Sequence, residues 1–361
     1  RAMAGAAARL PLLLLLVWAY RSTGLRAAWS ACEGVSPSPA RSGHTACAAT
    51  DGSLYLFGGY AEVQGERDVV NDLWRWRGGV WECVQPASDR SDRSRPGPRL
   101  CSASAIVGDQ LFLFGGWDPE VAGSGGSILD DVWCLRLGTM EWERLADSMP
   151  RGPTSRHVAC VADTQDGPRV IIHTFRCATS VVVFDPESRK ATEVPTSGPA
   201  PSSRGLHAAA ASGSKMFVFG GAAKDGQMMN DVHVLDTQAW TWSLPMVHEG
   251  ASPGPRAGAA ASATAIEGTF VVYGGAERAD GGGLQGRGDA WALQLLGDTE
   301  AAWELLLSEN DASAPPGRNA HTLTKVGAVG TTTQLLLHGG WQPFVRTFED
   351  THELYVHDDS R

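Results

Sequence analysis

Short apolar runs that end in a Gly-Gly pair recur along the sequence and predict a repeated strand. Five copies occupy residues 54–60, 111–117, 216–222, 270–276 and 335–341. A sixth, at residues 170–176, carries Thr174 and Phe175 where the glycines are expected. Successive side chains of a strand point to opposite faces, so runs that are apolar on both faces indicate strands packed between two layers. The glycines permit a sharp turn with positive φ at the strand end.

Three further elements accompany each run and define a longer repeat. An arginine opens a stretch of small residues before each run, at Arg41, Arg99, Arg156, Arg204, Arg256 and Arg318. An acidic or Asn-Asp segment follows each glycine pair, and a fourth element carries Trp81, Trp142, Trp242 or Trp303. The third copy is again degenerate, with Thr192 in the tryptophan position. We interpret these losses as sequence drift, although a specialised pocket in this copy is an open alternative.

With these four elements, the chain resembles the kelch-repeat family, and the resemblance covers residues 28–358. The arginines recur about every 55 residues, close to the kelch period. The repeats look most like those of host cell factor, Rab-effector and acyl-CoA-binding kelch proteins. The resemblance implies an all-β fold, a six-bladed kelch β-propeller. The 43 glycines, 20 prolines and scarcity of helix-forming runs agree with this fold class.

The N-terminal part of the chain is expected to close the ring. The sixth repeat has no tryptophan element, whereas Trp29 precedes Arg41 by the spacing of a fourth strand. Residues 28–33 should therefore complete the last blade and remove two open sheet edges. One domain, 28–361, is predicted, with first strands starting near 41, 99, 156, 204, 256 and 318.

Residues 1–27 form either a signal-like or a disordered extension. Residues 3–19 combine a positive charge with a short apolar run and small residues, as secretory signals do, but an Ala-rich disordered segment is the alternative. The expected location is the cytoplasm, or the secretory pathway if this segment is a signal peptide.

Charge and cysteine content narrow the function classes. The 361 residues include 30 Lys and Arg against 40 Asp and Glu, a net charge of −10, which argues against nucleic acid or stable membrane association. The seven cysteines are odd in number and form no CxxC pair, which argues against a zinc knuckle or a complete disulfide framework.

The six repeat arginines are candidates for partner binding. In an up-and-down blade, the connection into strand one shares a face with the long loops between strands two and three. Six arginines around a channel mouth would suit the carboxylates of an acidic segment. In the alternative interpretation, each arginine pairs with the acid that opens a third strand, at Asp72, Asp131, Asp231, Asp289 or Asp350.

Aromatic residues after the glycines mark three blades that a closed ring makes neighbours. Tyr60, Trp117 and Trp341, with Phe344 nearby, could form a protein-binding arc across blades six, one and two. The alternative is that each aromatic ring covers the gap between two blades.

The sequence favours a non-catalytic interaction scaffold that binds a protein segment, possibly acidic, without cofactor or metal, as a monomer. His44, His207 and His321 share one repeat position and are interpreted as architectural. Glu349, Glu353 and His357 resemble an iron motif of nitrile-specifier kelch proteins, but residues four apart in a strand lie too far apart to share one ion. The alternatives are a kelch enzyme, resembling either sialic-acid mutarotases or iron-dependent specifier proteins, and an extracellular carbohydrate-binding propeller.

Overall fold

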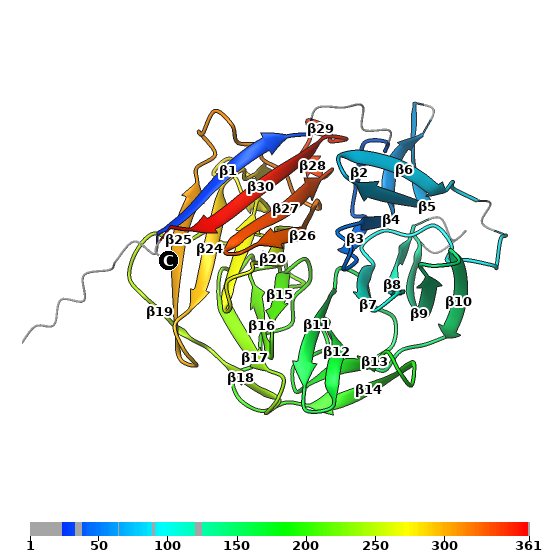
Figure 1. Cartoon of the computed structure of the whole chain (residues 1–361), viewed down its shortest axis with the longest axis horizontal. Coiled ribbons are helices and arrows are strands. Elements are labelled where there is room, and N and C mark those ends of the chain that lie inside the picture. The colour runs from blue at the N-terminus through cyan, green and yellow to red at the C-terminus, as the bar shows by residue number, and fades with distance from the viewer. Residues whose placement is uncertain (1–23, 33–37, 64, 89–90, 120–124, 360–361) are drawn as a thin grey trace, which may run out of the picture.

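The predicted second strands are buried on both faces and lie in the middle of six antiparallel sheets (Figure 1). The computed structural model describes residues 24–32, 38–63, 65–88, 91–119 and 125–359. Within these ranges the regular elements are all strands, and no helix long and apolar enough to cross a membrane is present. Each sheet is one blade, and the all-β, six-bladed architecture predicted from the sequence is confirmed.

The first three blades run as follows along the chain. Blade one comprises β2 (Arg41–Ser42), β3 (Thr45–Ala48), β4 (Leu54–Val63), β5 (Glu66–Arg77) and β6 (Val80–Gln85). Blade two comprises β7 (Ala103–Val107), β8 (Gln110–Asp118), β9 (Ser127–Arg136) and β10 (Glu141–Ala146). Blade three comprises β11 (Val158–Thr164), β12 (Gly167–His173), β13 (Ser180–Asp185) and β14 (Lys190–Pro195).

The remaining blades follow the same plan with small additions. Blade four comprises β15 (Ala208–Ser212), β16 (Lys215–Phe219), β17 (Val232–Asp236) and β18 (Thr241–Ser243). Blade five comprises β20 (Ala260–Ala263), β21 (Thr269–Tyr273), β24 (Ala290–Leu295) and β25 (Glu300–Leu307), with β19 (Met246–Val247) added in parallel to β25. Blade six comprises β26 (Thr322–Val329), β27 (Thr332–His338), β30 (Thr351–Asp358) and β1 (Leu25–Ala31).

The ring closes through the N-terminal strand. β1 pairs antiparallel with β30, from Leu25 opposite Asp358 to Ala31 opposite His352. The predicted closure by residues 28–33 is confirmed, although the strand begins earlier, at Leu25, inside the segment expected as an extension. Residue 33 and the signal-like residues 3–19 lie outside the described residues.

Each outer tryptophan packs against the end of strand two in the preceding blade. Trp142 lies 5.4 Å from Phe57, Trp303 lies 5.1 Å from Phe219, and Trp81 lies 4.6 Å from His338, between ring centroids. Trp29 makes the same contact with Tyr273 at 5.0 Å. Trp29 therefore fills the fourth-strand position of blade six, as its spacing predicts, and large aromatic rings fill the outer gaps between blades.

The Gly-Gly pairs allow each blade to contact the backbone of the next. A Cβ on Gly58, whose φ is +68°, would lie 2.8 Å from the carbonyl oxygen of Arg99. A Cβ on Gly339 would lie equally close, 2.8 Å, to the carbonyl oxygen of Arg41, across the closure between blades six and one. The neighbouring amide of Gly59 donates to that Arg99 carbonyl at 2.9 Å. Glycine is required here by both the φ angle and the close approach.

Six backbone hydrogen bonds form a closed inner ring around the propeller axis. Each blade contributes one amide and one carbonyl, at Gly43, Cys101, Arg156, Leu206, Gly258 and Ala320. Each amide donates to the carbonyl of the preceding blade, over 2.7 to 3.0 Å, and Gly43 donates to Ala320. All six residues have positive φ, between 52° and 70°.

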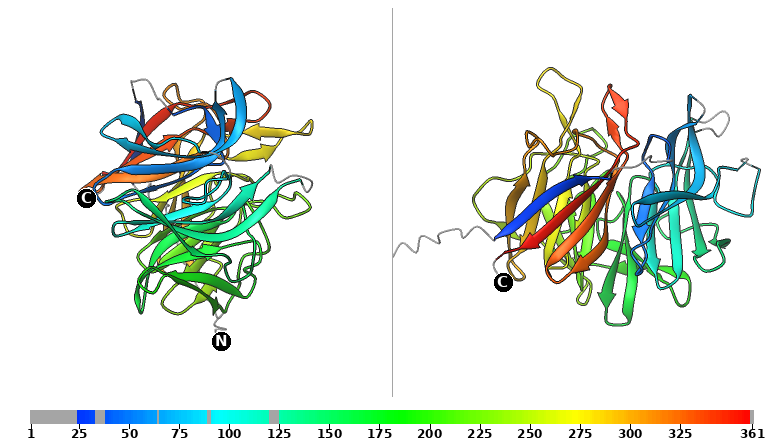
Figure 2. Two further views of the ribbon diagram at one scale, coloured as in Figure 1. Left: turned by 90° about the vertical axis from the view of Figure 1, so that its right-hand side faces the viewer. Right: turned by 45° about the horizontal axis from the view of Figure 1, so that its top comes forward.

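Two small hairpins extend from the same face of the disc (Figure 2). One is formed by β22 (Ala276–Arg278) and β23 (Leu284–Gly286) of blade five, the other by β28 (Trp341–Gln342) and β29 (Arg346–Thr347) of blade six. β4 and β5 also continue beyond the glycines of blade one as a paired extension. These segments are long loops between strands two and three, which the sequence analysis placed on the face of the repeat arginines, and residue 64 of the blade-one loop is outside the described residues.

Candidate protein-interaction face

Five of the six repeat arginines are buried in bidentate ion pairs. Arg41 donates from Nη1 to Asp72 Oδ1 at 2.9 Å and from Nη2 to Asp72 Oδ2 at 2.8 Å. The same arrangement joins Arg99 to Asp131, Arg204 to Asp231, Arg256 to Asp289 and Arg318 to Asp350. These arginines are at most 2% exposed. The geometry is that of the ion-pair alternative, and it leaves these five guanidinium groups inaccessible to a partner.

Each buried arginine links three segments of its own blade. In blade two, Arg99 Nη1 also donates to the carbonyl of Gly115 at the end of β8, at 3.0 Å, while Asp131 lies at the start of the apolar part of β9. Burial opposes ionisation of Asp131, but the hydrogen bonds and charge of Arg99 outweigh it and lower the pKa of the carboxyl. The pair thus stays ionised and holds the entry to strand one against strands two and three.

Each of these aspartates also forms a hydrogen bond with the side chain two residues later, and the residue that forms this bond differs among blades. Trp74, Trp133 and Trp291 donate Nε1–H to Asp72, Asp131 and Asp289, respectively, over 2.6 to 2.7 Å. In blades four and six, His233 and His352 take this position, at 2.9 Å from Asp231 and 3.0 Å from Asp350. The aspartate side chains are 7–9% exposed beside tryptophan and 35–38% exposed beside histidine. The smaller ring leaves the carboxylate partly open to solvent.

Blade three departs from this pattern, and Arg156 does not occupy the repeat-arginine position. In the other blades the inner strand begins four residues after the arginine, as in Arg99 and Ala103, whereas β11 begins two residues after Arg156. Thr154 takes the structural position instead, because its carbonyl accepts from Gly116 as that of Arg99 accepts from Gly59. The sequence pattern therefore placed the arginine position of this repeat two residues too late, at Arg156 instead of Thr154. The short spacing from Arg156 to the inner strand is the signal that reveals this error.

Arg156 lies on the inner ring and is exposed, unlike the other five arginines. A central cavity of about 130 Å³ opens there and is lined by the ring residues and by His44, His157, His207 and His321. Arg156 is the sole charged side chain among these lining residues. Its neighbour Leu206 is half-buried. One of the six predicted binding arginines is thus placed where a partner can reach it.

The repeat histidines pack between blades, as their architectural interpretation predicts. His44 contacts His338, His207 contacts His173, and His321 contacts Tyr273, with ring centroids 4.8 to 5.6 Å apart. His157 occupies the same position in blade three and is also buried. Burial is the main cause that lowers the pKa of His321 to about 3 and that of His157 to about 4, so these rings are neutral near pH 7.

The four candidate aromatic residues do not form one continuous cluster. Trp341 and Phe344 pack edge to face at 5.7 Å on the β28–β29 hairpin. Tyr60 is instead covered by the guanidinium of Arg67, 4.8 Å from the ring centroid, and Trp117 pairs with Leu100 in the extension of β8. Phe344 is 80% exposed and Val345 is 68% exposed, at the tip of their hairpin.

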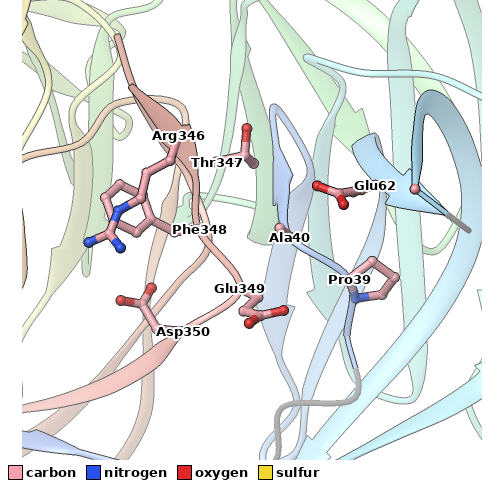
Figure 3. A pocket seen from close by; sticks show the side chains of 9 residues that line it. Pro39, Ala40, Glu62, Arg346, Thr347, Phe348, Glu349 and Asp350 are labelled. Carbon is pink, nitrogen blue, oxygen red and sulfur yellow. The ribbon is translucent and has the colours of Figure 1, made fainter. Parts of the chain in front are cut away.

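A pocket of about 590 Å³ lies where blades six and one meet (Figure 3). Glu62 comes from the β4–β5 extension and Arg346 from β29, whereas Phe348, Glu349 and Asp350 come from the segment between β29 and β30. The sequence analysis missed this pocket because its walls belong to the first and last repeats. Glu62 and Glu349, which follow the candidate aromatic residues Tyr60 and Phe344 by a few positions, were the available signal in the sequence.

In the part of the chain that the structure describes, no group of three or more His, Cys, Asp or Glu side chains is placed to hold a metal ion. Glu353 and His357 lie along one strand, β30, and all seven cysteines are unpaired.

Comparisons with known proteins agree with the repeat and the fold. The KLHDC2/KLHL20/DRC7 Kelch-repeats domain matches residues 18–179 and 171–360. The bovine (Bos taurus) Rab9 effector protein with kelch motifs is 34% identical over 171 residues, which cover 44% of this chain and 43% of that protein. Human (Homo sapiens) Kelch domain-containing protein 1 is 27% identical over 258 residues, covering 59% and 57%. The chain thus spans less than two thirds of these relatives.

A solved structure, titled Structure of YjhT, matches 87% of this chain and 94% of its own chain, with a TM-score of 0.65 and 16% sequence identity, a similarity that concerns the fold alone. The predicted resemblance is confirmed by the domain match, which extends over nearly the whole sequence. The chain belongs to the kelch-repeat family.

Proposed function

We propose that this propeller is a non-catalytic protein-interaction scaffold that binds a partner segment on the face carrying the hairpins and the inner ring. The observation that carries the proposal is the exposure of Phe344 and Val345 on a hairpin that lies outside the six blade sheets. Exposed large apolar side chains grouped at one rigid point are typical of protein-binding surfaces. The relatives include an effector of Rab9, whose name assigns that protein a protein partner.

The backbone at Phe344 supports a functional origin of this tip. Phe344 has a φ of +61°, a left-handed conformation that is costly for a bulky residue. The strands of the hairpin pair Trp341 with Thr347 and Gln342 with Arg346, and the amide of Val345 donates to Gln342. The hairpin therefore holds Phe344 in a conformation in which its ring is exposed.

Arg156 provides the position for an acidic residue of the partner. It is exposed at the mouth of the central cavity, and no carboxylate of a described residue pairs with it. A guanidinium in this position can form two parallel hydrogen bonds to a carboxylate. In this proposal the acidic contact comes from Arg156 alone and not from a ring of six arginines.

The test is selection from a library of random 16-residue peptides displayed on phage, panned against the full chain. We expect binders to the wild type and to Val329→Ser, an exposed valine at the far turn of blade six, and loss of binding in Phe344→Ser/Val345→Ser. Arg156→Glu should abolish any preference for Asp and Glu in the selected sequences. Undiminished binding by the Phe344→Ser/Val345→Ser variant would contradict the proposed face.

A further inference from the structure

The pocket between blades six and one has more negative than positive charge. Glu62 and Glu349 approach it from the two blades, as Figure 3 shows, and both side chains are exposed. Among the described residues, neither carboxylate takes part in an ion pair or hydrogen bond. Asp350 adds a third carboxylate, although Arg318 and His352 hold it in place.

Arg346, the cationic residue that lines the pocket, packs against an aromatic ring. The guanidinium of Arg346 lies 4.6 Å from the centroid of the buried Phe348 ring, and that of Arg318 lies 3.8 Å from the same centroid. A second cation, Arg67, lies opposite Glu62 across β4 and β5, where its guanidinium covers Tyr60 and donates to Thr347 of the pocket wall. Among the described residues, neither Arg67 nor Arg346 forms an ion pair with Glu62 or Glu349. The contact with Phe348 therefore keeps the Arg346 guanidinium away from Glu62 and Glu349.

The size and surroundings of the pocket indicate what kind of group it accepts. A volume of about 590 Å³ exceeds what a single ion needs and is sufficient for a long side chain with part of its backbone. Excess carboxylate repels the phosphates of nucleic acids and anionic lipids. The exposed Phe344 and Val345 immediately precede Arg346, so a segment that reaches the pocket also meets the apolar hairpin tip.

We propose that this pocket binds a lysine or arginine side chain of the partner segment, between Glu62 and Glu349. The inference rests on the proposed scaffold function and specifies the chemistry of the partner. An apolar residue of the same segment packs on Phe344 while its basic neighbour enters the pocket. The partner is therefore not uniformly acidic: it has a basic contact at blades six and one and an acidic contact at Arg156 in blade three.

The charge of the pocket can be tested with the peptides selected on the wild-type chain. We expect Lys or Arg to be enriched next to an apolar position, and the best peptide to bind about tenfold more weakly to Glu62→Gln/Glu349→Gln, as measured by fluorescence polarisation. Glu187→Gln/Glu267→Gln, which neutralises two exposed glutamates on turns of the opposite face, should leave the affinity unchanged. Thermal melting verifies that each variant is folded.

A charge exchange provides the positive control. A peptide whose basic residue is replaced by glutamate should bind weakly to the wild type and regain affinity for Glu62→Lys/Glu349→Lys. Selected peptides without a basic preference, or equal affinity for the wild type and Glu62→Gln/Glu349→Gln, would overturn the pocket assignment and leave the scaffold standing. A library that yields no binder would contradict the scaffold function itself.

Discussion

Blades two and three solve the same packing problem with opposite chemistry. Blade two buries Arg99 and Asp131 as an ion pair completed by Trp133 and the Gly115 carbonyl. Blade three has Thr154 in the arginine position and Ser180 at the start of its third strand. Ser180 donates to Glu193, which forms a partly exposed ion pair with Arg151 at 2.7 Å. The fold therefore tolerates the loss of the ion pair when both charges disappear together.

The largest expected effect comes from breaking the pair in blade two on one side only. Asp131→Ser leaves Arg99 buried without its carboxylate and should cost about 3–5 kcal/mol of unfolding free energy. The double variant Arg99→Thr/Asp131→Ser reproduces the chemistry of blade three and should cost less than the two single changes added together. Urea unfolding of the four proteins measures this coupling, and strictly additive costs would contradict the comparison.

Blade three also differs from the other blades at the Gly-Gly pair, where it has Thr174 and Phe175. Gly58→Ala places a Cβ against the carbonyl of Arg99 and should destabilise the propeller by about 2–3 kcal/mol. Gly108→Ala is the matched control, since Gly108 has a similar φ of +62° but no atom within 4 Å of the added Cβ. The control should cost only about 1 kcal/mol for its backbone conformation. Equal shifts in melting temperature would remove the role assigned to the contact between blades.

Mild acid should weaken blade contacts that contain a buried histidine. Burial, reinforced by the charge of Arg41, lowers the pKa of His338 to about 3, whereas an unfolded histidine titrates near 6.5. Only the unfolded chain takes up this proton between those values, so stability should fall as pH decreases from about 6.5 towards 3.

Phenylalanine occupies the equivalent position in blades one, two and four, at Phe57, Phe114 and Phe219. His338→Phe should therefore lose less stability than the wild type between pH 7 and pH 5.5, by about 1 kcal/mol. Urea unfolding at both pH values gives the slope, and an unchanged slope would show that His338 is not responsible for it.

The smallest effect on stability is expected at the arginine that sequence alignment grouped with the others. Arg156→Ala should change unfolding free energy by less than about 0.5 kcal/mol, because the side chain is exposed and holds no buried carboxylate. Arg99→Ala, measured alongside it, should cost several times more. A large loss at Arg156 would place it back among the structural arginines.

The repeat pattern was sufficient to predict the fold. Strand type, blade number and closure by Trp29 follow from periodic glycines, small residues and tryptophans, because each of these acts within its own repeat or on the adjacent one. The candidate site was harder to predict. Five arginines that look suited to a ligand instead bind aspartates some thirty residues away in sequence, and an ion pair and a binding residue have the same sequence signature.

Blade three shows where local similarity misleads. Arg156 precedes a histidine and small residues, as a repeat arginine does, yet its backbone takes the position of Gly43 and Cys101. The pocket between blades six and one could not be derived from one repeat, since Glu62 and Glu349 are brought together only by ring closure.

The inner ring also makes the channel mouth unusually free to diversify. Its hydrogen bonds involve only backbone atoms, so the assembly specifies a conformation at six positions but not a side chain. Glycine, cysteine, arginine, leucine and alanine all occur there in this one molecule. At the four positions that already hold a side chain, a substitution adds little left-handed strain, and it changes the chemistry displayed at the axis. The propeller thus has six positions around its axis at which substitutions can create a new binding specificity while the backbone ring is kept.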